Sequence, residues 1–126
     1  MKPLIYTCLV TVIIIFLSLS TIEMLENDSD VLENLILEIE NHVLMDRWEE
    51  AGLKEKQLKA QWEKYEKKWP MFIDHAEVDN ISYHLSELEV FVENKDRTLS
   101  EAKLSVLKLL VKNIPQKEYA ILQNIL

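Results

Sequence analysis

The feature that most constrains this chain is a stretch of 19 residues without a charge, from Leu4 to Ile22. A helix rises about 1.5 Å per residue, so a helix of this length just spans a hydrocarbon core of roughly 30 Å. We therefore predict one N-terminal transmembrane helix, with residues 1–22 as a membrane anchor that meets the membrane through residues 4–22. Residues 23–126 are then a separate domain.

The charges on the two sides of this stretch differ in sign. Lys2 precedes it, whereas Glu23 and three further acidic residues follow within eight positions, and the next basic residue is Arg47. The positive-inside rule then places the N-terminus in the cytoplasm and residues 23–126 outside the cell. The predicted location is the cell membrane, with a single pass.

A cleaved signal peptide is the competing interpretation. Ser18 and Ser20 are small residues at the positions that signal peptidase requires for a cut before Thr21. Against it, the apolar stretch exceeds the usual length of about 7 to 15 residues. Either interpretation exports residues 23–126.

The composition of the chain excludes several classes of fold and function. A single glycine leaves almost no residue for Gly-rich phosphate loops or tight hairpins, so we predict an all-α chain. One cysteine cannot form an internal disulfide, and a net charge of −8 without a basic run argues against a nucleic-acid partner.

Apolar residues recur at spacings of three and four in each of four segments, which we place at residues 23–46, 47–69, 70–96 and 97–126. The net charge of these segments alternates in sign along the chain. Short turns would bring oppositely charged neighbours side by side. We therefore predict a small antiparallel bundle of about four helices after the membrane helix.

Two features predict the ends of the first bundle helix. The cluster Asn27-Asp28-Ser29-Asp30 is poor helix material that is expected to kink or end the membrane helix. Asp46 with Glu49 has the form of a capping box, which would begin the second helix.

Prolines and a second capping box predict the later boundaries. Pro70 suits the first turn of the third helix, and Thr98 with Glu101 would cap the fourth. Pro115 is expected to interrupt that helix and leave a short, docked terminal helix at residues 116–126.

Four aromatic residues form a stripe in the second segment: Trp48, Trp62, Tyr65 and Trp69. Their helical spacing favours packing in the core, because a bundle of this size needs large buried side chains. The alternatives are a groove for a protein partner, or a platform that stacks on cell-wall glycans.

Acidic and histidine side chains are concentrated near the start of the third segment. His75 and Asp79 are four residues apart and share a helix face, so they could begin a metal site if a neighbouring helix supplied a third ligand. The simpler interpretation is that Asp74 favours the first turn of a helix and that His75 packs partly buried.

The chain resembles the bacterial family called domain of unknown function 4363. The resemblance rests on the segments Arg47-Trp48-Glu49-Glu50-Ala51, Trp62, Trp69, Phe72-Ile73-Asp74-His75, Glu77-Val78-Asp79-Asn80-Ile81 and Asn124-Ile125-Leu126. It implies a short, membrane-anchored protein of clostridia and other spore-forming Firmicutes, with an exported helical part. It supplies no catalytic residue.

These patterns favour a protein that acts by binding. We predict a non-enzymatic interaction module, or an accessory subunit of an envelope membrane complex, with a protein partner, no cofactor and no small-molecule substrate. The candidate interaction or structural residues are Trp48, Trp62, Tyr65, Trp69, Phe72, Asp74, His75 and Asp79. The alternatives are a metal-binding protein or metal-dependent enzyme centred on His75 and Asp79, and a glycan-binding module.

Overall fold

The computed structural model describes residues 1–125, and Leu126 lies outside the described residues. Four α-helices and one short 3₁₀ turn account for nearly all of that range. In chain order they are α1 (Lys2–Leu44), α2 (Trp48–Lys68), η1 (Trp69–Met71), α3 (His75–Glu93) and α4 (Arg97–Ile125). The predicted all-α class is confirmed.

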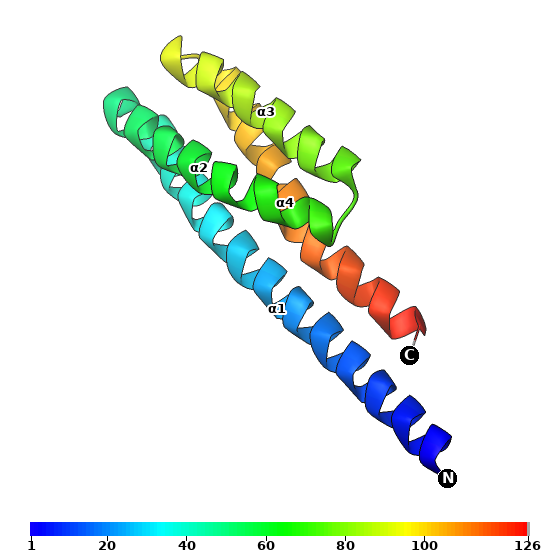
Figure 1. Ribbon diagram of the computed structural model, residues 1–126. Helices are drawn as coiled ribbons and strands as arrows, with labels where there is room; N and C mark the ends of the chain where they lie inside the picture. The colour runs from blue at the N-terminus through cyan, green and yellow to red at the C-terminus, as the bar shows by residue number, and fades with distance from the viewer. Residues whose placement is uncertain (126) are drawn as a thin grey trace.

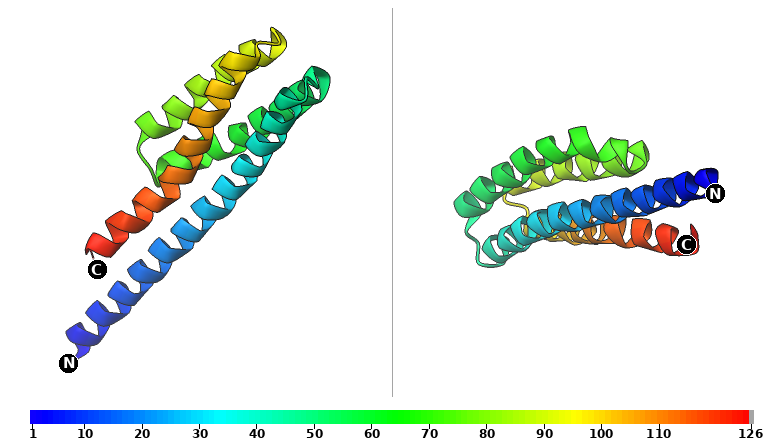
Figure 2. Two further views of the ribbon diagram at one scale, coloured as in Figure 1. Left: turned by 180° about the vertical axis from the view of Figure 1, so that it is seen from behind. Right: turned by 60° about the horizontal axis from the view of Figure 1, so that its bottom comes forward.

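The helices run up and down in an antiparallel bundle (Figure 1). α1 packs against α2 and α4, and α3 completes the ring by packing against the same two helices. Both termini lie at one end, which we call the base, and the α1–α2 and α3–α4 turns lie at the opposite, distal end (Figure 2). The predicted bundle of about four helices is therefore confirmed.

α1 has two parts in different surroundings. Its N-terminal part extends past the rest of the bundle as a lone helix (Figure 1), and its first buried residue is Ile22. This part is long and apolar enough to cross a membrane, and only 6% of its most apolar window is buried within the fold. From Ile22 onward the same helix forms one wall of the bundle.

The predicted kink at residues 27–30 is wrong, because α1 continues through them. Asp28 and Ser29 are both buried, and partners on other helices engage their side chains. Asp28 Oδ2 accepts a hydrogen bond of 3.0 Å from Trp69 Nε1 and lies 2.8 Å from Lys68 Nζ. These bonds remove the competition with the backbone that makes such residues poor helix formers.

The predicted interruption at Pro115 is also wrong, because α4 continues to Ile125. A proline inside a helix has no N–H for the carbonyl four residues earlier, which here belongs to Val111. The hydroxyl of Ser29 donates to that Val111 oxygen from across the interface. One side chain of α1 therefore satisfies the acceptor that Pro115 leaves without its usual donor.

Both predicted capping boxes lie beside the true helix starts. Asp46 does not cap α2, because it takes a left-handed φ of 55° in the turn, and the N-cap position belongs to Arg47. α4 begins at Arg97, and the carboxylate of Asp96 accepts the capping hydrogen bond from Leu99 N at 3.0 Å, in place of Thr98.

The third helix begins later than Pro70 predicts. Pro70 lies in η1, and α3 begins at His75 with Asp74 as its N-cap. Asp74 Oδ1 accepts a hydrogen bond of 3.0 Å from Ala76 N. The helix ends at Glu93, within the predicted segment of residues 70–96.

The Ser29–Val111 hydrogen bond gives a test of this packing. We expect Ser29→Ala to lower the free energy of unfolding by about 1 to 3 kcal/mol, because it leaves a buried carbonyl without its cross-helix donor. In a Pro115→Ala background the same change should cost clearly less, because the restored N–H serves the carbonyl. Urea unfolding of the full chain in detergent, followed by circular dichroism, measures the double-mutant cycle.

Ser105→Ala, on the exposed face of α4, is the matched control and should change stability by less than about 0.5 kcal/mol. Equal losses from Ser29→Ala in both backgrounds would show that Ser29 does not act through the carbonyl released by Pro115.

Candidate functional site

Three of the four aromatic residues in the predicted stripe form a cluster inside the bundle. Trp69 has no exposed surface, and Trp62 and Tyr65 are also buried. The ring of Trp62 meets that of Trp69 edge-on at a centroid distance of 5.3 Å, and the Tyr65 ring stacks on Trp69 at 6.1 Å. This geometry is that of packed core aromatics and leaves no open platform for a sugar ring at these positions.

The indole N–H groups of this cluster have partners on other helices. Trp69 donates to Asp28 of α1, as described above. Trp62 Nε1 donates to Ser82 Oγ of α3 at 2.7 Å, and Ser82 in turn donates to Glu66 Oε2 at 3.1 Å. The cluster therefore connects η1 to α1 through Trp69, and α2 to α3 through Trp62.

The predicted acidic and histidine residues do not converge. Asp74 caps α3, whereas His75 and Asp79 lie exposed along its first turns. Within residues 1–125 no group of three or more His, Cys, Asp or Glu side chains is placed to hold a metal ion. The metal-site alternative therefore has no supporting geometry in the part of the chain that is described.

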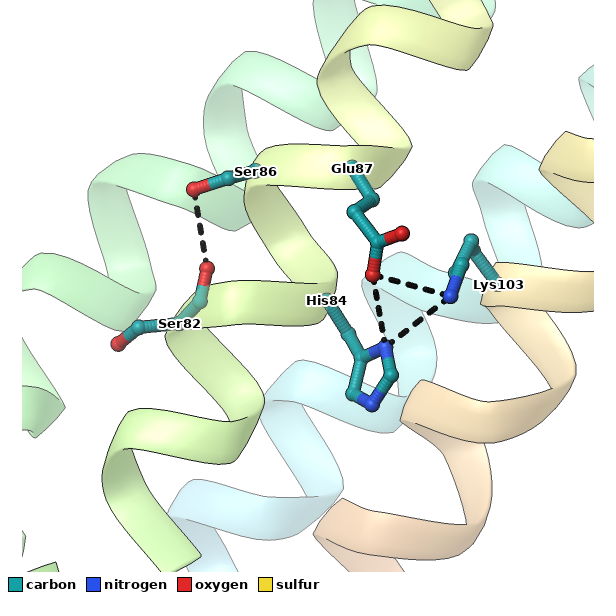
Figure 3. A network of polar contacts seen from close by, with 5 residues as sticks. All are labelled: Ser82, His84, Ser86, Glu87 and Lys103. Atoms are coloured by element: carbon teal, nitrogen blue, oxygen red, sulfur yellow. Dashed lines mark hydrogen bonds and ion pairs between the residues drawn. The ribbon is translucent and has the colours of Figure 1, made fainter. Parts of the chain in front are cut away.

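A different histidine lies in a polar network on the interface between α3 and α4 (Figure 3). Glu87 Oε1 lies 3.2 Å from His84 Nδ1 and 2.9 Å from Lys103 Nζ. Figure 3 also shows Ser86, whose hydroxyl donates to the backbone oxygen of Ser82 at 3.1 Å. The Glu87 carboxylate therefore has a cation from α4 beside it.

A groove at the distal end of the bundle is lined by a buried carboxylate of α2, that of Glu55, which has an oxygen without a hydrogen-bond partner among the described residues. This distal groove lies between the start of α2 and the end of α3 and has a volume of about 430 Å³. The residues that line it are Trp48, Glu49, Gly52, Leu53, Glu55, Lys56, Glu89, Val92, Glu93 and Lys95. Of the residues predicted from sequence, only Trp48 lies here, half-buried against the core.

Glu55 is the unusual member of the distal groove. Its side chain is only 4% exposed, and its Oε1 atom has no hydrogen-bond partner among the described residues. Burial, together with the neighbouring charges of Glu89 and Glu93, raises the pKa of the Glu55 carboxyl to about 7, against the opposing effect of Lys59 and Lys56. The group is therefore close to half-ionised at neutral pH.

Sequence reasoning missed Glu55, although the pattern contained a signal. Ala51, Leu58, Trp62 and Tyr65 mark the buried face of α2, and Glu55 falls on that face at the same three-and-four spacing. An acidic residue at a core position is uncommon in a helical bundle. That position alone could have singled out Glu55 among the acidic residues of α2.

Gly52, the single glycine of the chain, also lines the distal groove. It lies within α2, where a glycine lowers helix stability relative to alanine. A Cβ atom built at this position meets no described atom within 4 Å. Close packing inside the bundle therefore gives no reason for a glycine here.

A second groove lies at the base, beside the predicted end of the membrane span. This basal groove brings Ile22 and Leu25 of α1 next to Phe72 and to Ile121 and Ile125 of α4. Phe72, one of the residues predicted from sequence, is 40% exposed here. Large apolar side chains are thus accessible at the level where α1 leaves the bundle.

Ionisation of Glu55 predicts an unusual dependence of stability on pH. The folded state raises the pKa of Glu55 above its ordinary 4.5, so the fold binds more protons than the unfolded chain between pH 4.5 and about 7 and loses stability as the pH rises through that range. Glu55→Gln should raise the free energy of unfolding at pH 8 by about 1 to 3 kcal/mol, and by much less at pH 4.5. Urea unfolding at the two pH values measures the difference.

The exposed Glu50→Gln provides a control with the same change in formal charge. A gain from Glu55→Gln that is equal at both pH values would contradict ionisation of Glu55 as its cause.

A second stability test concerns Gly52. Gly52→Ala should raise the free energy of unfolding by about 0.5 to 1 kcal/mol, because alanine favours the helix and its methyl group has space. Thermal unfolding followed by circular dichroism is the measurement. A loss of stability would show that the fold itself requires the glycine.

The comparisons with known proteins identify a family and assign no activity. Neither the curated proteins nor the solved structures that were compared contain a significant match to the chain. The family model described as domain of unknown function DUF4363 matches residues 19–125, which include the whole bundle that the structure describes. The chain therefore belongs to the DUF4363 family, as its sequence resemblance predicts.

Proposed function

We propose that this protein is a single-pass membrane protein whose extracytoplasmic bundle binds a protein partner in the cell envelope, as an interaction module or accessory subunit. Residues 4–22 cross the membrane, the N-terminus is cytoplasmic and the bundle acts by binding, without catalysis. The observation that carries the proposal is the continuity of α1, which is an exposed apolar helix at one end and a wall of the bundle at the other.

The exposed half of α1 supports anchoring. Leu9, Ile14 and Phe16 are each more than half exposed, although a soluble bundle gains nothing from such a helix. Lipid is the environment in which this surface is stable. The bundle follows without a linker, so its position relative to the bilayer is fixed by the helix.

The basal groove supports the same placement. The last turns of α4 lie beside residues 18–25 of α1, which is the level of the bilayer surface if residues 4–22 span it. Met71 and Ile125 are 78% and 76% exposed at this level, and both are suited to the membrane interface. Burial raises the pKa of Glu118 in this groove, which eases its approach to lipid.

Charge supports the orientation. Lys2 lies on the side that we assign to the cytoplasm, and the first basic residue beyond the span is Arg47, at the distal end of the bundle. Residues 23–46 contain no Lys or Arg, which is the distribution typical of an external segment.

Cysteine accessibility tests the topology. In a Cys8→Ser background, Lys64→Cys places a thiol on the exposed face of α2, and Lys2→Cys places one before the span. We expect a membrane-impermeant maleimide to label Lys64→Cys in intact cells, and Lys2→Cys only after permeabilisation. The opposite pattern, or release of the bundle from washed membranes, would overturn the proposed topology.

Affinity purification tests the proposed binding role. The tagged full-length chain, solubilised from its native membrane, should recover one protein in stoichiometric amount. His75→Ala is the matched control, because His75 is exposed on the opposite end of α3 from the distal groove and should leave recovery unchanged. Recovery of no stoichiometric protein would contradict an accessory role.

A further inference from the structure

We propose that the distal groove is a receptor for one lysine or arginine side chain of the protein partner, with its cationic group bound by the carboxylate of Glu55. The inference rests on the proposed function in one respect, namely that the bundle binds a protein. It adds the site on the bundle and the chemistry of the contact.

The first step is the unsatisfied carboxylate. Glu55 Oε1 is buried and has no partner within the described range, and a buried acceptor in that state is costly. Lys59 on the same helix is already engaged, because its Nζ lies 2.8 Å from Glu89 Oε2. An incoming ammonium or guanidinium group would supply the N–H donor that the fold itself does not.

The second step is the space beside that carboxylate. Gly52 precedes Glu55 by one turn of α2, and the position of its absent side chain is open. A groove of about 430 Å³ is large enough for a long side chain. Since packing within the bundle does not require the glycine, the open space points to an occupant from outside.

The third step is the match between the walls of the groove and the ligand. Trp48, Leu53 and Val92 provide apolar surface for the methylene stem of a lysine or arginine. Glu89 and Glu93 add negative charge, and the acidic residues that line the groove outnumber Lys56 and Lys95. This combination of apolar walls and buried carboxylate selects an organic cation over an anion.

Binding through Glu55 is linked to a proton. The groups that face Glu55 are Glu89 and Glu93 on α3 and Lys56 and Lys59 on α2, and burial together with these charges leaves its pKa at about 7. A bound cation favours the ionised carboxylate, so binding releases a proton and strengthens as the pH rises. For a group with that pKa, the ionised fraction and hence the affinity rise about tenfold between pH 6 and pH 8.

The test uses the full-length protein in lipid nanodiscs with glutamate labelled in its carboxyl carbon. The Glu55 signal is assigned by its loss in Glu55→Gln. The probes are lysine blocked at both backbone ends and norleucine blocked in the same way, which has the same stem without the ammonium group. We expect blocked lysine to move the Glu55 signal, with about tenfold higher affinity at pH 8 than at pH 6, and blocked norleucine to leave it in place.

Two variants report on the groove itself. Gly52→Ala should reduce the affinity for blocked lysine at least severalfold while the melting temperature stays equal or rises, which separates a filled groove from a damaged fold. Gln57→Ala, on an exposed face of α2 that lines a different groove, should leave the affinity unchanged. Equal binding of norleucine, an unchanged affinity in Gly52→Ala, or no response of Glu55 to blocked lysine would each overturn the proposal.

A further probe, the free diamine cadaverine, tests whether the natural ligand of the groove is a soluble amine and not a side chain of a protein. Binding of cadaverine much tighter than that of blocked lysine would overturn the assignment to a partner side chain. The purification described above distinguishes the two proposals. A stoichiometric partner that is still recovered with Gly52→Ala would overturn the groove as the binding site and leave the interaction role. Binding of blocked lysine without any recovered partner would overturn the interaction role and the assignment to a partner side chain, and would leave only a groove that binds organic cations.

Discussion

The structure depends on one helix that serves two environments without a break. α1 passes from a lipid-suited surface to a bundle wall within a few residues, and the transition holds because Asp28 and Ser29 find partners across the interface. Ser29 satisfies the Val111 carbonyl that Pro115 leaves open, and Asp28 holds Trp69 and Lys68. The side chains of Asp28 and Ser29 and the carbonyl of Val111, which would otherwise disfavour a continuous helix, therefore each have a hydrogen-bond partner on another element.

Local pattern was sufficient to predict the helices and insufficient to predict their boundaries. Spacings of three and four identified all four segments, because burial of one face determines that period. The errors at residues 27–30 and at Pro115 share a cause. The local propensity of each site opposes a continuous helix, whereas in the fold the two sites satisfy each other through a contact between residues 82 positions apart. A single sequence does not reveal such a pairing.

The candidate site, too, could be predicted from the sequence only in part. The spacing of Trp62, Tyr65 and Trp69 predicted their place in the core, and the structure puts them there. Glu55 lies on the same stripe, so its position could have been noticed in the sequence. That its Oε1 has no partner within the described residues, and that Gly52 opens space beside it, depends on how α3 crosses α2, which pattern alone does not determine.

The unbroken course of α1 also fixes the distance between the base and the distal end of the bundle. Between Ile22 and Leu44 the helix rises by about 33 Å at 1.5 Å per residue, with no hinge along that length. For a bundle anchored through residues 4–22, the turns at the distal end therefore stand at a constant height above the bilayer. Under the proposed topology, a partner that binds at this end must itself extend about as far from the bilayer, and short loops close to the lipid surface do not reach it.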